Sequence, residues 1–310
     1  MKTLKNALAL AILGLCGTHA LADTGKLLLT GGVSAIDGAA GGGMTPWAVI
    51  GTNATSGEIG GTAFVTRAST QDYGLTTVGA AVGWHDRVEV SLARQDFNAS
   101  PSIALNGIAP FGVTPGQHIN MDILGVKVKV AGDAVLDSDS WMPQIAVGLE
   151  HKRVSPGSLA SVLNFLDTRT SGTDVYVSAT KLLLAQSVLV NGTLRYTNAN
   201  QNGLLGFGSG APGRSSRSLV PEFSVAYLLS KNWAVGAEYR VKPNNLEALG
   251  RAAGLGDALA EDNWKDLFVA WAPNKHTSVT LAYVDLGRIV PGITGNRKQT
   301  GYYLSAQVAF

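Results

Sequence analysis

The chain has 310 residues, of which 38 are glycine, 15% are charged and one is cysteine. Its 24 basic and 22 acidic residues nearly balance, which argues against a nucleic-acid partner because such a partner needs a basic surface. The abundant glycine, the low charge and the lack of a long apolar helical segment favour an all-β envelope protein over an α/β enzyme.

The first 22 residues have the organisation of a secretory signal peptide. Lys2 and Lys5 precede an apolar run over residues 7–15, and Ala20-Leu21-Ala22 forms the small-x-small pattern of a cleavage site. We therefore predict a signal peptide over residues 1–22 and a mature chain that begins at Asp23. Cleavage leaves 22 basic residues against 22 acidic ones.

Cys16 lies inside the predicted signal, so its removal excludes disulfide and thiol chemistry in the mature protein. A lipoprotein anchored through Cys16 is the alternative interpretation. Leu15 disfavours it, because lipoprotein processing requires a small residue at that position. The apolar run is also shorter than the roughly 18 residues that a membrane-spanning helix needs.

Residues 23–60 are rich in glycine and show no regular alternation. An apolar start from Lys26 to Val33 leads into Gly38, Gly41, Gly42 and Gly43, and then into Thr-Pro-Trp-Ala-Val-Ile at residues 45–50. Such stretches are typical of turns and close backbone approaches rather than of phosphate cradles. We predict that this segment either plugs a barrel or supplies its first strands.

From Gly61 to Phe310 apolar and polar side chains alternate with the period of two that is typical of β-strands. Leu124, Val126 and Val128, for example, alternate with Lys127 and Lys129. The last eleven residues have the same pattern, with an apolar face and a mildly polar face. In a transmembrane barrel the apolar face contacts lipid and the polar face lines the lumen.

The connections between these strands alternate in length. Short ones lie at residues 84–86, 133–140, 184–186, 230–232 and 273–276, and long ones at 98–119, 153–172, 198–217, 242–263 and 287–299. Short periplasmic turns and long extracellular loops are typical of outer-membrane barrels. We therefore predict a transmembrane antiparallel up-and-down β-barrel over residues 61–310. Twelve strands are favoured, and 14 are the alternative if residues 26–36 and 47–52 add two.

Aromatic residues gather near the predicted strand ends, as the two interfacial belts of a membrane barrel require. Tyr73, Phe97, Tyr239 and Tyr302 lie toward the outer ends. The candidates for membrane-interface residues are Trp84, Trp141, Trp233, Trp271 and Phe310 at the periplasmic ends and Trp264 at an outer end.

The polar faces of the strands carry charges of both signs. The lumen-lining candidates are Arg87, Glu89, Lys127, Lys129, Glu150, Lys152, Asp174, Arg195, Glu222, Glu238 and Arg240. Such a set can select ions, or its members can neutralise one another and fill a narrow barrel. Lys127 and Lys129 follow each other on one face and are the best candidates for an anion-attracting patch.

Two of the long loops contain helical patterns. Leu159, Val162, Leu163 and Leu166 have helical spacing, and residues 246–259 form a second amphipathic stretch. Either segment can fold into the pore as a constriction or pack over its rim.

Catalytic and metal-binding patterns are weak. The four histidines outside the signal show no metal-ligand spacing, and we predict no cofactor. His151 shares an outward face with Leu149, where a lipid-modifying enzyme would need it. However, no serine is placed to partner it and no G-x-S-x-G motif occurs, so we predict that the protein is not an enzyme.

Two stretches carry a family resemblance. Residues 25–33 read Gly-Lys-Leu-Leu-Leu-Thr-Gly-Gly-Val and continue to Gly-Gly-Gly-Met-Thr-Pro-Trp-Ala at 41–48, and residues 86–95 read Asp-Arg-Val-Glu-Val-Ser-Leu-Ala-Arg-Gln. They resemble the proteobacterial family catalogued as domain of unknown function 3034 (DUF3034), over nearly the whole mature chain. The resemblance implies an outer-membrane protein without an assigned substrate, so no catalytic residue is carried over.

The C-terminal strand with its final Phe310 also resembles those of bacterial outer-membrane barrels, whose assembly machinery reads that strand. We expect that machinery, membrane lipids and lipopolysaccharide as partners, together with a small solute that the sequence does not identify. The favoured function is a porin-like channel for small polar solutes in the bacterial outer membrane. The alternatives are a non-conducting structural or adhesive barrel and, less favoured, a lipid-modifying enzyme.

Overall fold

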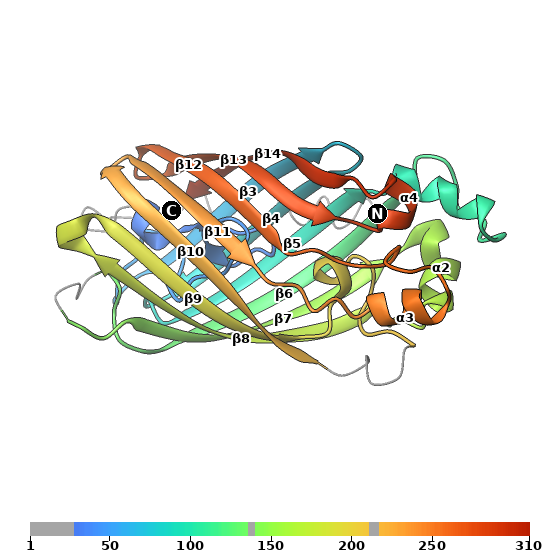
Figure 1. The fold of residues 1–310 in the computed structure, drawn as a ribbon. Coiled ribbons are helices and arrows are strands. Elements are labelled where there is room, and N and C mark those ends of the chain that lie inside the picture. Colours follow the sequence, from blue (N-terminus) through green and yellow to red (C-terminus); the bar gives the residue numbers. More distant parts are fainter. Residues whose placement is uncertain (1–27, 136–139, 211–216) are drawn as a thin grey trace, which may run out of the picture.

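The alternating side chains of residues 59–309 build twelve antiparallel strands in the computed structural model, which describes residues 28–135, 140–210 and 217–310 (Figure 1). The predicted signal peptide lies outside these residues. The strands are β3 (Ile59–Thr70), β4 (Gly74–Trp84), β5 (Val88–Asn98), β6 (His118–Ala131), β7 (Gln144–Ser155), β8 (Ser171–Leu183), β9 (Val188–Thr197), β10 (Ser218–Ser230), β11 (Trp233–Arg240), β12 (Trp264–Asn274), β13 (Thr277–Arg288) and β14 (Lys298–Ala309).

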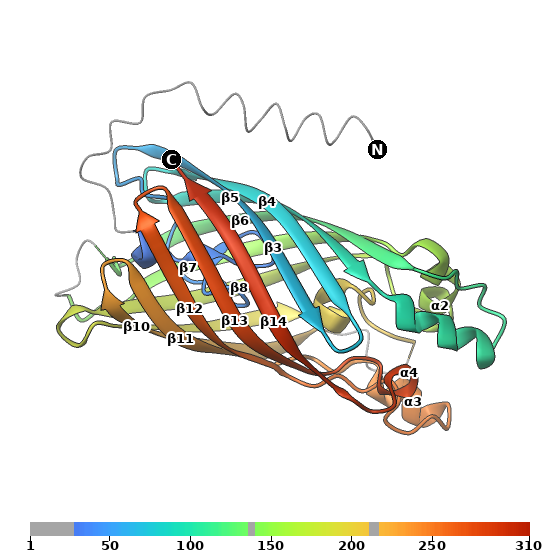
Figure 2. The same ribbon diagram turned by 90° about the horizontal axis from the view of Figure 1, so that it is seen from above.

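The ring closes between the last strand and the first barrel strand (Figure 2). Each strand pairs with the next in the chain, and β14 pairs with β3, with Ala306 opposite Val65. Closure leaves no strand edge unpaired, which lipid demands because it offers no hydrogen bonds to backbone groups. The predicted twelve-stranded barrel is therefore confirmed.

The alternative of 14 strands is wrong. Residues 33–34 and 40–41 form only a short two-stranded sheet of their own, β1 (Val33–Ser34) with β2 (Ala40–Gly41). Neither strand joins the wall, because the glycines between residues 38 and 43 turn the chain back on itself after a few residues.

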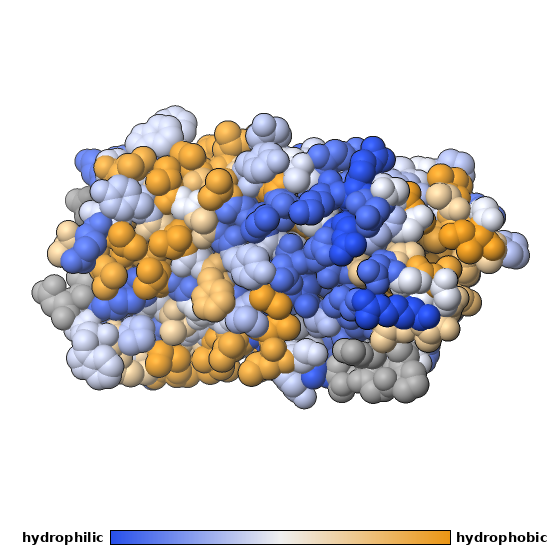
Figure 3. Space-filling model, in the orientation of Figure 1, coloured by the Kyte–Doolittle hydropathy of each residue, from blue (hydrophilic) through white to orange (hydrophobic). Residues whose placement is uncertain are grey.

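The two faces of the wall follow the alternation. In β14, Tyr303, Ser305 and Gln307 are buried inside the barrel, whereas Tyr302 and Leu304 are exposed on the outside. The outward face is apolar near the short turns, which is the side of the C-terminus (Figure 3).

Toward the long loops the outward face becomes polar. Arg94 pairs with Asp122 at 3.4 Å, and Lys265 pairs with Asp285 at 3.3 Å. On the face drawn in Figure 3, the side chains become more hydrophilic from the turn side toward the long loops.

The helices α2, α3 and α4 lie at the long-loop end (Figure 1), whereas η4 lies in the short turn between β8 and β9. Among the described residues, no helix is long and apolar enough to cross a membrane. The helical elements are η1 (Leu28–Gly31), η2 (Ser100–Gly107), η3 (Gly157–Leu159), α2 (Ala160–Phe165), η4 (Leu184–Gln186), η5 (Asn200–Gly203), α3 (Glu247–Ala252) and α4 (Pro291–Thr294).

A disulfide across the seam tests the closure. In a Cys16→Ser background, Val65→Cys with Ala306→Cys should form a cross-link, because these residues face each other on paired strands. The cross-link is measured as a reductant-sensitive change in mobility on denaturing gels.

Val65→Cys with Val279→Cys is the matched control. Val279 faces Ala306 from the far side of β14, two strand spacings of about 4.8 Å from Val65 and beyond the reach of a disulfide. Equal cross-linking of the two pairs, or none in the first, would contradict the closed ring.

Candidate functional site

Residues 28–54, which we call the inner segment, lie inside the barrel, and every one of them is buried. Figure 1 shows this part of the chain within the ring, toward the end that holds the C-terminus. The segment occupies space that an open porin would leave to water.

Two buried carboxylates of the wall bind the backbone of the inner segment. Glu238 on β11 accepts hydrogen bonds from the N–H groups of Met44 at 2.7 Å and Thr45 at 3.2 Å. Glu89 on β5 accepts them from Ala40 at 3.0 Å and Gly51 at 2.7 Å. These bonds satisfy backbone donors that no regular secondary structure pairs.

The backbone carbonyls of the inner segment are satisfied in the same way. The Lys127 ammonium donates to the carbonyl oxygens of Ala40 at 3.0 Å and Trp47 at 3.1 Å, and it lies 3.1 Å from the Glu89 carboxylate. Gln144 donates to the Ala48 carbonyl at 2.8 Å. The polar lumen therefore serves as the hydrogen-bonding partner of the segment.

The glycines of this segment are needed where the backbone approaches the wall. A Cβ on Gly42 would lie 2.3 Å from a Glu238 oxygen, and one on Gly41 would lie 2.0 Å from the carbonyl oxygen of Thr45. A side chain on Gly42 would therefore push the segment away from the Glu238 carboxylate, and one on Gly41 would collide with the segment's own backbone.

Asp37 joins the inner segment to a buried cluster of charges, the ionic cluster. Its carboxylate lies 3.2 Å from Arg240 and 3.5 Å from Lys152. Lys152 also pairs with Asp174 at 3.0 Å and Glu150 at 3.3 Å. The cluster consists of Asp37, Glu150, Lys152, Asp174, Arg195, Glu222 and Arg240.

Arg195 connects the carboxylates of Glu150 and Glu222 within this cluster. It lies 2.7 Å from Glu150 and also binds Glu222, which in turn lies 3.2 Å from Arg240. Since buried charges are costly unless they are paired, each member depends on its neighbours.

Nine of the eleven predicted lumen residues are buried inside the barrel. They are Glu89, Lys127, Glu150, Lys152, Asp174, Arg195, Glu222, Glu238 and Arg240.

The other two predicted lumen residues lie at the turn side. Arg87 is exposed in the turn before β5, because that strand begins only at Val88. Lys129 lies at the rim, where it pairs with Asp86 and, at 3.2 Å, with Asp133. Lys127 is likewise paired with Glu89, so the proposed anion-attracting patch on these two lysines is neutralised by carboxylates.

The predicted periplasmic aromatics are at the turn side. Trp233 and Trp271 stack with ring centroids 5.6 Å apart on paired positions of β11 and β12, and both are exposed. Trp141 is 89% exposed, and Trp84 and Phe310 are half-buried.

Trp264 is not at the outer lipid interface, and this prediction is wrong. The side chain is only 4% exposed and lies inside, with the Lys242 ammonium 3.9 Å and the Arg240 guanidinium 5.8 Å from its ring. The period of two contained the signal, because Trp264 shares a face with the buried Asp266. Tyr73 and Phe97, also predicted for the outer belt, are buried and stack inside the mouth at 5.2 Å.

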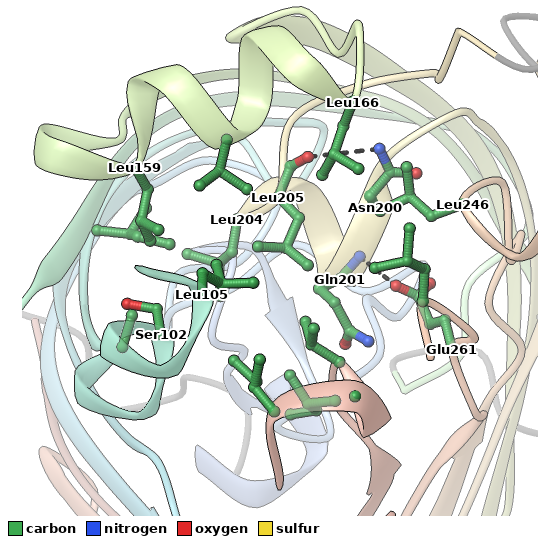
Figure 4. Close-up of a pocket in the computed structure, with 18 of the residues that line it drawn as sticks. Ser102, Leu105, Leu159, Leu166, Asn200, Gln201, Leu204, Leu205, Leu246 and Glu261 are labelled. Carbon is green, nitrogen blue, oxygen red and sulfur yellow. Dashed lines mark hydrogen bonds between the residues drawn. The ribbon is translucent and has the colours of Figure 1, made fainter. Parts of the chain in front are cut away.

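The outer mouth contains a cavity of about 550 Å³ (Figure 4). Leucines from several loops line it, among them Leu105, Leu163, Leu204 and Leu246. The helical spacing predicted around Leu163 corresponds to η3 and α2, and part of the predicted stretch 246–259 forms α3. Both segments lie over the mouth, not in the lumen.

Lys242 and Glu261 form an ion pair of 3.3 Å between the outer loops. Burial lowers the pKa of Lys242 to about 8 and raises the pKa of Glu261. Glu261 also accepts a hydrogen bond from the backbone N–H of Gln201 and lines the cavity (Figure 4).

The described residues contain no group of three or more His, Cys, Asp or Glu side chains arranged for a metal ion. His151 lies exposed on the outward face of β7, where its Nδ1 is 2.9 Å from the Thr173 hydroxyl of β8.

Loss of one ionic-cluster member should destabilise the barrel strongly. Arg195→Met leaves Glu150 and Glu222 without their main counter-charge, which should lower the free energy of unfolding by about 3–5 kcal/mol. Denaturant titration in phospholipid vesicles, followed by tryptophan fluorescence, measures this loss. Arg94→Met breaks an exposed pair and should cost less than about 1 kcal/mol. Equal losses of unfolding free energy in the two variants would show that burial of the cluster does not add to its contribution to stability.

Comparison with known proteins identifies a family and a fold. A family model described as protein of unknown function (DUF3034) matches residues 30–307. No curated protein matches the chain. A solved NanC porin superposes with a TM-score of 0.50 at 12% identity, covering 79% of this chain and 98% of the porin.

Two further structures superpose less closely. The KdgM porin has a TM-score of 0.49 at 8% identity, over 80% of this chain and 99% of that one. Outer membrane phospholipase A from Escherichia coli has a TM-score of 0.40 at 11% identity, over 81% and 92%. At 12% identity the likeness to the NanC porin shows the fold, that of an outer-membrane barrel. Because the family model covers residues 30–307, the chain belongs to the DUF3034 family, and it forms a β-barrel of the bacterial outer membrane.

Proposed function

We propose that this protein is a channel for small polar solutes whose lumen is held shut by the inner segment. The observation that carries the proposal is the burial of all residues from 28 to 54 inside the barrel, with their backbone bound to Glu89 and Glu238. In this state the segment takes the place of the water column that a solute would cross.

The wall behind the segment is suited to polar solutes once it is uncovered. Glu238, Glu89 and Lys127 now bind the segment, and they would be exposed to lumen water if the segment moved. Water would then replace the segment as the hydrogen-bonding partner of these three side chains. Charged side chains on a lumen wall select which solutes pass.

A short turn joins the inner segment to the first barrel strand. Thr55 and Glu58 form a tight turn just before β3, with the Thr55 N–H 2.8 Å from the Glu58 carboxylate. This turn tethers the segment to the wall at one end. Its contacts with the barrel are hydrogen bonds, ion pairs and packing, all of which are reversible.

A non-conducting barrel is the second candidate. It is favoured by the ionic cluster, which binds Asp37 with two buried cations and thereby stabilises the closed state. We further propose that the protein is not an enzyme. The outward-facing His151, the candidate for a lipid-modifying site, contacts the hydroxyl of a threonine and not that of a serine nucleophile.

Deleting residues 28–54 should open the channel. The wild-type barrel should show little conductance in planar bilayers, and the deletion variant should show steady porin-like currents because its lumen is filled by water. The heat-dependent gel mobility of closed barrels verifies that the variant is folded. A folded deletion variant without conductance would sink the channel proposal and favour the second candidate.

A reversible lock provides the matched experiment without a deletion. Ser34 on the inner segment donates a 2.9 Å hydrogen bond to Gln307 on β14. Ser34→Cys with Gln307→Cys, in the Cys16→Ser background, should abolish any wild-type openings when oxidised and restore them with reductant. Ser34→Cys alone should respond to neither treatment. Openings that persist in the oxidised double variant would show that the segment does not need to move.

A further inference from the structure

We propose that the cavity at the outer mouth is a binding site for a small molecule with an apolar body and one neutral hydroxyl group. This site differs from the lumen in its chemistry, because leucine and isoleucine side chains line it whereas charges line the lumen. Its assignment does not depend on whether the barrel conducts.

The size and lining of the cavity define the body of the ligand. A volume of about 550 Å³ falls in the range of roughly 300–1,000 Å³ that is usual for small-molecule sites. Leu105, Leu159, Leu166, Leu204 and Leu246 approach it from different loops (Figure 4). Such walls offer water no hydrogen bonds, whereas an apolar ligand would bind by removing their apolar surface from water.

Two buried polar side chains in this wall define the polar end of the ligand. Ser102 and Gln201 are each only 4% exposed. The Ser102 hydroxyl and the Gln201 Oε1 atom have no hydrogen-bond partner among the described residues. Figure 4 shows both side chains among the leucines of the cavity. Buried polar atoms are normally satisfied, so unpaired ones in the wall of an apolar cavity indicate an absent partner.

The chemistry of these atoms restricts the ligand group. Gln201 Oε1 only accepts hydrogen bonds, so the ligand must donate one, and the Ser102 hydroxyl can accept or donate the second. A carboxylate is disfavoured, because it would face both this acceptor and the nearby Glu261. A cation gains little there, since Glu261 is already paired with Lys242. A hydroxyl group is neutral and can donate to Gln201 or form its hydrogen bond with Ser102.

Two amide side chains of the cavity are already occupied, whereas the indole N–H of Trp264, which also lines it, has no hydrogen-bond partner among the described residues. The Asn200 amide donates to the Gly208 carbonyl at 2.7 Å, and the Asn245 amide donates to the Asn198 carbonyl at 3.0 Å. The polar groups available to the ligand are therefore Ser102, Gln201 and the Trp264 N–H, and a hydroxyl oxygen can accept a hydrogen bond from the last of these.

Equilibrium dialysis of decan-1-ol against the full chain in lipid nanodiscs tests the site, with empty nanodiscs of the same lipid as the correction for partitioning. We expect about one decan-1-ol per barrel, bound more tightly than decanoate or decylamine. The variant that removes the partner of the hydroxyl, Ser102→Ala or Gln201→Met, should weaken binding about fivefold, the effect of one lost hydrogen bond, and unchanged binding in both would overturn the assigned polar end. Absence of decan-1-ol binding, or tighter binding of decanoate, would overturn the assignment.

Filling the cavity is the second arm. Leu204→Trp should reduce binding at least tenfold, because the larger side chain occupies the cavity. Leu184→Trp is the matched control on the opposite end of the barrel, where Leu184 is 60% exposed, and should leave binding unchanged. Equal binding by wild type and Leu204→Trp would refute the site. So would one phospholipid that remains bound per barrel and is lost in Leu204→Trp, since the cavity would then hold a lipid chain.

Discussion

Backbone hydrogen bonding in lipid is the constraint on which the rest of this structure depends. A strand edge exposed to hydrocarbon would leave N–H and C=O groups unpaired at a cost of several kcal/mol each. The chain avoids this by pairing β14 with β3, which makes every strand an interior strand. Closure then determines two faces. One contacts lipid through residues such as Leu304, and the other, through residues such as Gln307, encloses a lumen that must be filled by water or by protein.

Protein fills much of that lumen here, and the polar wall makes this possible. The inner segment has little regular secondary structure, so its backbone groups need partners, and Glu89, Glu238 and Lys127 provide them. Asp37 in turn completes the ionic cluster, because without it Lys152 and Arg240 would lose a counter-charge. Wall and segment thus satisfy each other. The same polarity that lets the wall bind the segment would let it line a water-filled pore.

The outer mouth has the opposite character. The long loops meet over the mouth of the barrel, and their leucine side chains point toward one another. They enclose a cavity whose lining is mainly apolar, unlike the charged lumen below it. The two regions meet at η5. Gln201 faces the cavity, while the next residue, Asn202, contacts Asp37 at 2.7 Å and Arg240 at 2.7 Å. The floor of the cavity and the top of the ionic cluster are therefore built from adjacent residues with left-handed backbone conformations.

The sequence by itself determined the barrel, favoured the observed twelve strands and identified nine buried charged residues, because a period of two and the alternation of loop lengths are local properties. It left open whether residues 23–60 form strands or a plug. It also placed Arg87 in a strand that begins only at Val88, and it placed Trp264 on the outward face although the side chain is buried inside. Only the tertiary structure decided how Asp37 meets Lys152 and Arg240, and how Ser102 and Gln201 come to share an apolar cavity. These contacts join residues that are far apart in the chain, and no local pattern encodes which inward side chains meet across a closed ring.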